Sequence, residues 1–171
     1  MNTEMLYGAQ VISDIWKETN GDAIVVSDVG QHQMLEAQYY KHDEPNTLLT
    51  SGGLGTMGFS LPAAIGASFS NRDKDIWVIV GDGSIQMTIT ELATAVQENT
   101  NIKIAIINNG YLGMVRQWQQ LFYDSRYTET PISSPDYVKL SEAYGMKGFR
   151  VKSRAEISDT MKEAQNIKGP V

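Results

Sequence analysis

Two apolar runs, and the residues that follow each of them, constrain the fold of this chain more than any other feature. The runs are IWVIV at residues 76–80 and IKIAIIN at residues 102–108. Both are rich in β-branched residues and neither alternates with polar ones, which is typical of parallel strands covered on both faces. Gly81-Asp82-Gly83 follows the first run, and Asn108-Asn109-Gly110 ends the second. The sequence therefore predicts an acid and an amide at neighbouring strand ends, where open α/β sheets bind ligands.

The rest of the chain alternates strand and helix patterns, which predicts one α/β domain over residues 1–171, with a doubly wound parallel sheet flanked by helices. Further strands are expected at residues 23–26, 47–50 and 147–151. Helices are expected at residues 6–20, 31–41, 61–69, 90–98, 112–121, 136–144 (capped by Ser134 or Asp136, with Gly145 as its stop) and 155–167. Gly169-Pro170-Val171 resembles the start of one more strand, so we expect the chain to be a fragment that lacks its last strand.

Composition excludes several function classes. The chain has 171 residues, a formal net charge of −6 and a pI near 4.9, which disfavours binding to nucleic acid or to an anionic membrane. It has no cysteine, so thiolate chemistry and disulfides are excluded. No apolar run is long enough to span a membrane, and the first residues do not resemble a signal peptide. We therefore expect a cytoplasmic protein.

The glycines at residues 53, 55 and 58 satisfy the dinucleotide fingerprint G-x-G-x-x-G, with Asp82 roughly where a ribose-binding acid belongs. A Rossmann-type dinucleotide-binding module is therefore one interpretation. Against it, the preceding run at residues 47–50 is short and half polar, which is a poor central first strand. Asp82 also lies between two glycines instead of standing alone.

A magnesium and diphosphate site is the other interpretation of Asp82 and Asn109. Mg²⁺ prefers six oxygen ligands, usually one or two of them carboxylates with phosphate and water among the rest. Glycines on both sides of Asp82 would let backbone N–H groups approach a phosphate. The alternative is that Asp82 closes a turn and that Asn108-Asn109-Gly110 is an ordinary turn tripeptide. The GDG motif at residues 81–83, followed by NN at residues 108–109, resembles the cofactor motif of thiamine-diphosphate-dependent enzymes.

Longer segments sharpen the resemblance to acetolactate synthase (acetohydroxyacid synthase) catalytic subunits. The chain is similar to that family from about residue 6 to its last residue. The matching segments are GQHQM at residues 30–34, TSGGLGTMG at 50–58, GDGS at 81–84 and NNGYLGMVRQW at 108–118. Leu35 stands where the family often has an aromatic residue.

The resemblance implies a set of cofactor and substrate residues. The residues that it places around thiamine diphosphate are Gln31, His32, Gly55, Met57, Asp82, Gly83, Ser84, Asn109, Tyr111, Leu112, Gly113 and Met114. Met57 is implied as the apolar support that bends the cofactor. Asp82, the Asn109 side chain and the Tyr111 main-chain carbonyl are implied as Mg²⁺ ligands. Val115 and Trp118 are implied near the substrate entrance, although helical spacing alone is equally compatible with packed core residues.

The resemblance also implies the reaction and its partners. The family decarboxylates pyruvate and condenses the product with a second pyruvate or with 2-oxobutyrate, in branched-chain amino-acid biosynthesis. The activating glutamate comes from the N-terminal domain of a partner subunit, and a middle domain binds FAD. We therefore expect a homodimer or higher oligomer, with a regulatory small subunit as a further possible partner. Glu91 and Glu98 lie on a predicted helix and are expected to be ordinary helix charges, so no catalytic residue is expected in this chain.

Two further classes stay open from the sequence. Another thiamine-diphosphate-dependent 2-keto acid decarboxylase or lyase would share GDG and NN, but should lack the segment at residues 110–119. A non-catalytic binding module is the other possibility, since the isolated chain is expected to be inactive.

Overall fold

The structure, a computed structural model, describes residues 5–171. The first four residues of the predicted domain lie outside this range.

Four parallel strands form one sheet in the order β2-β1-β3-β4. The strands are β1 (Ile24–Ser27), β2 (Leu48–Thr50), β3 (Ile76–Gly81) and β4 (Ile102–Ile107). The helices are α1 (Gly8–Glu18), α2 (Gln31–Tyr39), α3 (Ser60–Ser70), α4 (Asp82–Met87), α5 (Leu92–Gln97), α6 (Gly113–Phe122), α7 (Tyr137–Ala143) and α8 (Ile157–Asn166), with 3₁₀ turns η1 (Ile89–Glu91) and η2 (Arg154–Glu156).

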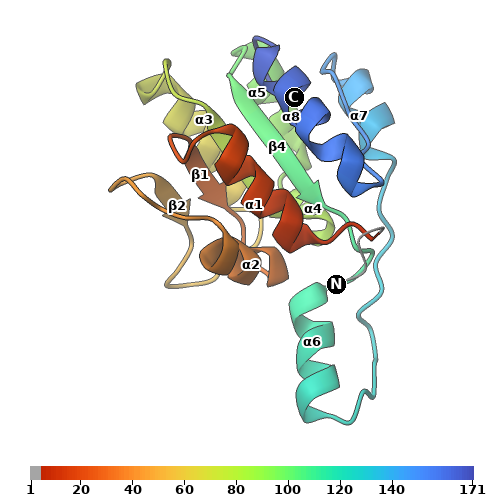
Figure 1. Ribbon diagram of the computed structural model, residues 1–171. Coiled ribbons are helices and arrows are strands. Elements are labelled where there is room, and N and C mark those ends of the chain that lie inside the picture. Colours follow the sequence, from red (N-terminus) through yellow and green to blue (C-terminus); the bar gives the residue numbers. More distant parts are fainter. Residues whose placement is uncertain (1–4) are drawn as a thin grey trace.

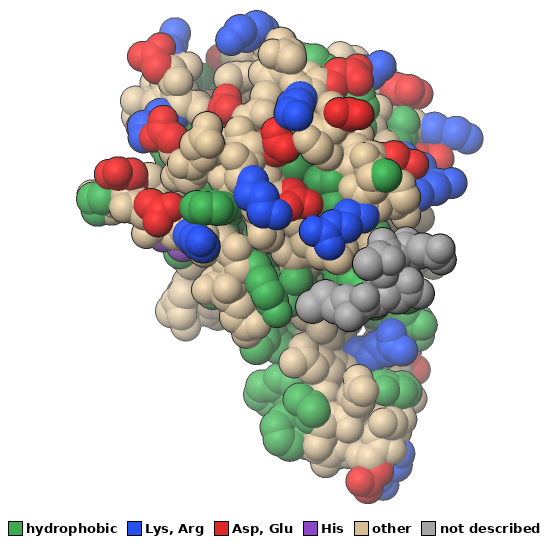
Figure 2. All heavy atoms as spheres, in the orientation of Figure 1, with side chains coloured by type: hydrophobic (Ala, Val, Ile, Leu, Met, Phe, Trp, Pro, Cys, Tyr) green, Lys and Arg blue, Asp and Glu red, His purple; other side chains and the backbone are tan. Residues whose placement is uncertain are grey.

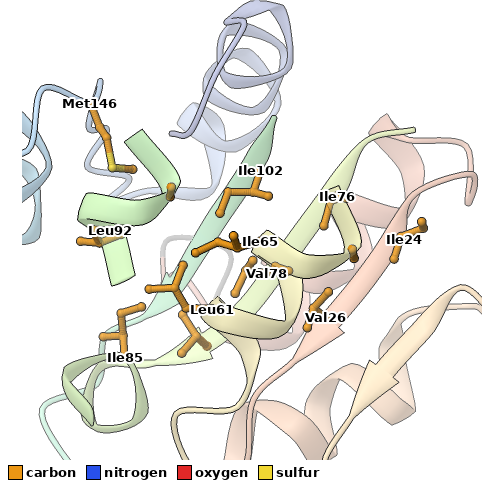
Figure 3. Close-up of a cluster of buried hydrophobic side chains, with 14 residues drawn as sticks. Ile24, Val26, Leu61, Ile65, Ile76, Val78, Ile85, Leu92, Ile102 and Met146 are labelled. Carbon is orange, nitrogen blue, oxygen red and sulfur yellow. The ribbon is translucent and has the colours of Figure 1, made fainter. Parts of the chain in front are cut away.

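Helices cover both faces of the sheet, which confirms the predicted doubly wound α/β fold (Figure 1). Residues of α3, α4, α5 and α7 enclose the core on one face, which contains Val26, Val78 and Ile85 (Figure 3). Residues of α1, α2 and α8 enclose the other core, which contains Val25 and Ile79. Successive strand residues point to opposite faces, so β1 and β3 supply both cores. Every residue of β1 and β3 is buried, which explains why these runs do not alternate with polar residues.

The predicted strands at residues 23–26, 47–50, 76–80 and 102–108 are all present, and so are the seven predicted helices, with boundaries within about two residues. Asp136, the second of the two suggested caps, accepts hydrogen bonds from the backbone N–H groups of Val138 and Lys139. Gly145 ends that region with a φ of +83°. No helix in residues 5–171 is both long and apolar enough to cross a membrane.

The prediction of a strand at residues 147–151 is wrong, because those residues form no ladder. A β-favouring run becomes a strand only where a neighbour completes its backbone hydrogen bonds. The free edge of β4 is met instead by Val171, whose N–H donates to the Ile102 carbonyl (3.1 Å) and whose carbonyl accepts from the Ile104 N–H (2.8 Å). The segment Gly169-Pro170-Val171 therefore does run beside β4, as its resemblance to the start of a strand suggested.

Candidate functional site

The two strand-end motifs meet directly at Asp82. Its side chain is buried, and its Oδ2 atom accepts hydrogen bonds from the Gly110 N–H and the Ser134 hydroxyl, both at 3.0 Å. No hydrogen bond within residues 5–171 reaches the Asp82 Oδ1 atom. Gly110 has a φ of +72°, which a residue with a side chain rarely adopts, so the turn after β4 favours glycine. The acid and the amide predicted at neighbouring strand ends therefore share one site, with one carboxylate oxygen left free.

Three helices begin at this site without a side-chain cap. They are α2 after Gly30, α4 after Gly81 and α6 after Leu112, and residues from the first turn of each line one pocket. The first N–H groups of a helix have no acceptor within the helix, and the helix dipole adds positive potential there. An uncapped helix start is therefore suited to an anion such as phosphate. The short helix α4 was not predicted, because the two glycines beside Asp82 suggested a turn.

His32 lines the same pocket and has a buried nitrogen without a partner. Its Nε2 atom makes no hydrogen bond to any of residues 5–171, although the residue is only 6 % exposed. Burial lowers the pKa of His32 to about 4, and the nearby carboxylates of Asp28 and Asp82 offset only part of that shift. The imidazole is therefore neutral at neutral pH. An unpaired buried polar atom costs stability, so a ligand that hydrogen bonds to this nitrogen would recover part of that cost.

Three glycines keep the pocket walls close together. A Cβ atom on Gly81 would lie 2.8 Å from the His32 ring, and one on Gly113 would lie 2.8 Å from the Gln31 Oε1 atom. A Cβ atom on Gly83 would lie 3.2 Å from Leu112 and 3.8 Å from the Met57 Cε atom. From the sequence, the glycines beside Asp82 are expected to let backbone N–H groups approach a phosphate. In the structure, protein side chains also occupy the space next to both glycines.

The pocket gathers almost every residue that the resemblance implied for the cofactor. Its lining includes all of them except Gly55, which lies beside Val29 in the exposed part of the loop before Met57. Leu35 and Val115 also line it, whereas Trp118 does not. The lining residues come from four separate segments of the chain, at residues 29–35, 57, 81–84 and 107–115, which the sheet order brings together. Glu91 and Glu98 lie elsewhere, and the lining contains no glutamate.

Helix α6 projects from the body of the domain (Figure 1) and is not part of the core. Val115 is 48 % exposed and Trp118 57 %, so the interpretation of these two residues as packed core is wrong. Leu121 and Phe122 are exposed as well, and hydrophobic side chains gather on this projection (Figure 2). The side chains of Gln31 and Gln117, 2.9 Å apart, link the start of α2 to α6.

Sequence reasoning missed the residues that hold the site in place. Asp28 is fully buried at the end of β1, and it accepts hydrogen bonds from the backbone N–H groups of Val29, Gly58 and Ser60. The hydroxyl of Tyr137 donates to the Asp82 carbonyl at 2.8 Å, and Ser134 reaches the Asp82 carboxylate. These contacts join segments far apart in the chain. An acid directly after a buried strand was the one available signal for Asp28.

The donors and acceptors in the pocket fit a magnesium diphosphate. Residues 5–171 contain no cluster of three His, Cys, Asp or Glu side chains that could hold a metal ion alone. Among the described residues, the Asp82 Oδ1 atom accepts no hydrogen bond, the Asn109 Oδ1 atom accepts one, from the Tyr111 N–H at 2.9 Å, and no hydrogen bond uses the Tyr111 carbonyl. This set of one carboxylate, one amide and one carbonyl leaves coordination positions for phosphate oxygens and water, as Mg²⁺ usually requires.

Comparison with known proteins gives an independent result. Residues 28–171 match the model of the thiamine pyrophosphate enzyme family, C-terminal TPP binding domain. Thiamine pyrophosphate is the compound called thiamine diphosphate above. The match begins at Asp28 and includes every segment of the pocket.

The chain is also similar to named proteins. It is 49 % identical over 160 residues to the acetolactate synthase catalytic subunit, mitochondrial, of Saccharomyces cerevisiae, covering 94 % of this chain and 23 % of that protein. It is 45 % identical over 164 residues to the acetolactate synthase isozyme 3 large subunit of Escherichia coli, and the alignment covers 95 % of this chain and 29 % of that protein. It is 49 % identical over 162 residues to the acetolactate synthase large subunit of Corynebacterium glutamicum, and that alignment covers 92 % of this chain and 26 % of the relative. The chain thus spans about a quarter of the length of these relatives.

The family result decides between the two interpretations of the glycine-rich loop. The strand before the loop, β2, is a three-residue strand at the sheet edge, which is unlike the central first strand of a dinucleotide-binding unit. The Rossmann interpretation is therefore wrong. The uncapped helix starts, the free Asp82 oxygen and the family match agree with one another, and the chain belongs to the thiamine pyrophosphate enzymes, as their C-terminal TPP-binding domain.

Proposed function

We propose that this domain binds the magnesium diphosphate of thiamine diphosphate within an acetolactate synthase. The observation that carries the proposal is the convergence of three uncapped helix starts on Asp82, which is itself hydrogen bonded to the turn after β4. The similarity to three acetolactate synthases over nearly the whole chain supports the choice of enzyme within the family.

In this proposal each residue of the pocket binds or orients the cofactor. Asp82, Asn109 and the Tyr111 carbonyl hold Mg²⁺. Backbone N–H groups near Gly83, Ser84, Leu112, Gly113 and Met114 donate to the diphosphate, with Gln31 and His32 as side-chain partners, and Gly55 allows the loop before Met57 to approach. Because His32 is neutral, it adds no charge to the site, and it donates to a diphosphate oxygen in the tautomer that carries the proton on Nε2.

The cofactor would supply the carbon nucleophile that adds to a 2-keto acid and accepts the electrons left when CO₂ departs. Met57 would support it from the apolar side of the pocket, since the flexible thioether fills irregular gaps. Val115 and Trp118, exposed on α6, would lie along the route of pyruvate and of the second substrate, pyruvate or 2-oxobutyrate. The product would be an acetohydroxy acid of branched-chain amino-acid biosynthesis.

The remaining parts of the reaction would lie outside this domain. The pocket lining contains no glutamate, so we propose that the activating glutamate comes from the N-terminal domain of a partner subunit, in a cytoplasmic homodimer or higher oligomer. FAD would bind in a middle domain, and a regulatory small subunit is a further proposed partner. We also propose a further parallel strand, which would pair with the part of β4 near Ile106. The residues of β4 from Ile104 to Ile107 are only half-buried, and Val171 pairs with the strand only at Ile102 and Ile104.

The proposal is tested in the complete enzyme by calorimetric titration with thiamine diphosphate, with and without Mg²⁺, followed by assay of acetolactate formed from pyruvate. Asp82→Ala should abolish the dependence of cofactor binding on Mg²⁺, because the metal loses its one anionic protein ligand. Asp159→Ala is the control, since Asp159 is an exposed carboxylate on α8.

Undiminished Mg²⁺ dependence in Asp82→Ala would refute the ligand assignment. Acetaldehyde as the main product would instead indicate a decarboxylase. Formation of acetolactate by the isolated 171-residue chain would contradict the requirement for a glutamate from another domain.

A further inference from the structure

Asp28 is a fully buried carboxylate near the pocket, and the hydrogen bonds that its side chain accepts within residues 5–171 all come from backbone N–H groups. Its Oδ1 atom accepts from the N–H groups of Val29 (2.8 Å) and Gly58 (2.9 Å), and its Oδ2 atom accepts from Ser60 (2.8 Å). No cation forms an ion pair with it within residues 5–171. Ser60 begins α3, whose positive end favours this carboxylate. Asp28 therefore joins the end of β1 to the start of α3 through the glycine loop.

The loop that Asp28 holds carries Met57. Gly58, the next residue, has a φ of +86°, and its carbonyl accepts a hydrogen bond from the Thr88 hydroxyl at 3.1 Å. The turn is thus fixed by Asp28 on one side and by Thr88 on the other. The preceding residues 52–56 are exposed, and added Cβ atoms at Gly52 and Gly53 would meet nothing within 4 Å. The position of Met57 in the pocket therefore depends on these two anchors.

We infer that Asp28 is a positioning residue, which sets Met57 against the bound cofactor; this inference rests on the function proposed above. Asp28 accepts no hydrogen bond from the backbone N–H groups that are proposed to bind the diphosphate, so that part of binding is separable from positioning. The Asp28 carboxylate does act on His32 through its charge. Asp28→Asn keeps the shape of the side chain but replaces one acceptor oxygen with a donor that faces the Ser60 N–H. The turn at Gly58 would loosen and Met57 would withdraw.

Two measurements in the complete enzyme test this inference. The first is backbone hydrogen exchange at Gly58 and Ser60 in the cofactor-free protein, which should be about tenfold faster in Asp28→Asn, because hydrogen bonds to a charged acceptor are lost. The second is the rate at which the C2 proton of thiamine diphosphate exchanges with solvent, expressed per bound cofactor. That rate should fall about tenfold or more, because a small misplacement at a reacting centre has a large kinetic effect. Cofactor affinity should change less than about threefold.

The matched control is Glu36→Gln. Glu36 is equally buried, but its partner is His42 (2.5 Å) and it does not touch the loop. Both measurements should stay at the wild-type value in this variant. If Asp28→Asn does not fold, Thr88→Val removes the other anchor and should slow C2 exchange in the same direction, by about threefold.

Unchanged exchange at Gly58 and Ser60, an unchanged C2 rate in Asp28→Asn, or an equal loss in Glu36→Gln would each overturn the inference. Where Asp28→Asn does not fold, an unchanged C2 rate in Thr88→Val would do so. If the wild-type enzyme does not bind thiamine diphosphate, the proposed function fails instead, while the backbone exchange of the cofactor-free protein still decides whether Asp28 holds the loop.

Discussion

At the scale of single residues, the pocket depends on pairs in which one residue is small because its neighbour is large. Gly81 and His32 are such a pair, since any Cβ atom at residue 81 would lie 2.8 Å from the imidazole. The sequence identified both residues, but through separate motifs. Their contact could not be predicted, because it depends on how α2 packs beside β3.

Gly81→Ala should therefore destabilise the domain by about 1–3 kcal/mol, because the buried ring has no space to move without cost. The loss should shrink in a His32→Ala background, and a double-mutant cycle by chemical denaturation measures that coupling. Gly66→Ala is the control, since a Cβ there meets nothing within 4 Å and Gly66 lies inside α3. Equal losses from Gly81→Ala in both backgrounds would contradict the proposed clash.

The residues that sequence reasoning could identify are those inside local motifs, such as Asp82 with its glycines and Asn109 before Gly110. The roles of Asp28, Gln117 and Ser134 were missed because each acts through a contact with a distant segment. A local pattern can mark such a residue, as the end of a buried strand marks Asp28, but it does not show which distant group the side chain will bind. Their roles follow from the packing of the elements.

At the scale of elements, the end of the chain is fastened to β4 by a buried lysine. The Nζ atom of Lys103 donates to the carbonyls of Ile167 (2.7 Å) and Gly169 (2.9 Å) and to the Asn101 side chain (2.9 Å). The sequence predicted the strand correctly, but nothing in its pattern showed that the lysine is 1 % exposed. The same C-terminal tail explains why residues 147–151 do not form the predicted strand, since Val171 forms the backbone hydrogen bonds at the edge of β4 instead.

Burial lowers the pKa of Lys103 to about 8, whereas an unfolded lysine keeps its ordinary value of 10.5. Between these two pH values the unfolded chain binds a proton that the folded chain does not, so stability rises with pH across this window. The rise from this group amounts to about 3–4 kcal/mol across the whole window. Lys103→Met should remove it and should also add a pH-independent loss of about 1–3 kcal/mol from the unpaired carbonyls.

Denaturation of both proteins from pH 7 to pH 11 measures this difference, and the other titrating groups cancel in the comparison. Parallel stability curves for the wild type and Lys103→Met would show that the lysine titrates normally.

At the scale of the whole molecule, the strand order places the ends of β1, β3 and β4 side by side, so the segments after them meet at one pocket. The alternation of strands and helices was enough to predict this architecture and the sheet edge at which the pocket lies. The projection of α6 was not predictable, because an amphipathic helix does not reveal what its apolar face meets. Its Trp118 and Phe122 are both more than half exposed and pack edge-to-face against each other.

We propose that Asp82 anchors a magnesium diphosphate where α2, α4 and α6 begin. A crystal structure of the complete enzyme with thiamine diphosphate and Mg²⁺ is the decisive test. We expect a metal ion about 2.1 Å from oxygen atoms of Asp82 and Asn109, with diphosphate oxygens completing its coordination. A metal ion that does not touch Asp82, or a diphosphate bound away from these helix starts, would contradict it.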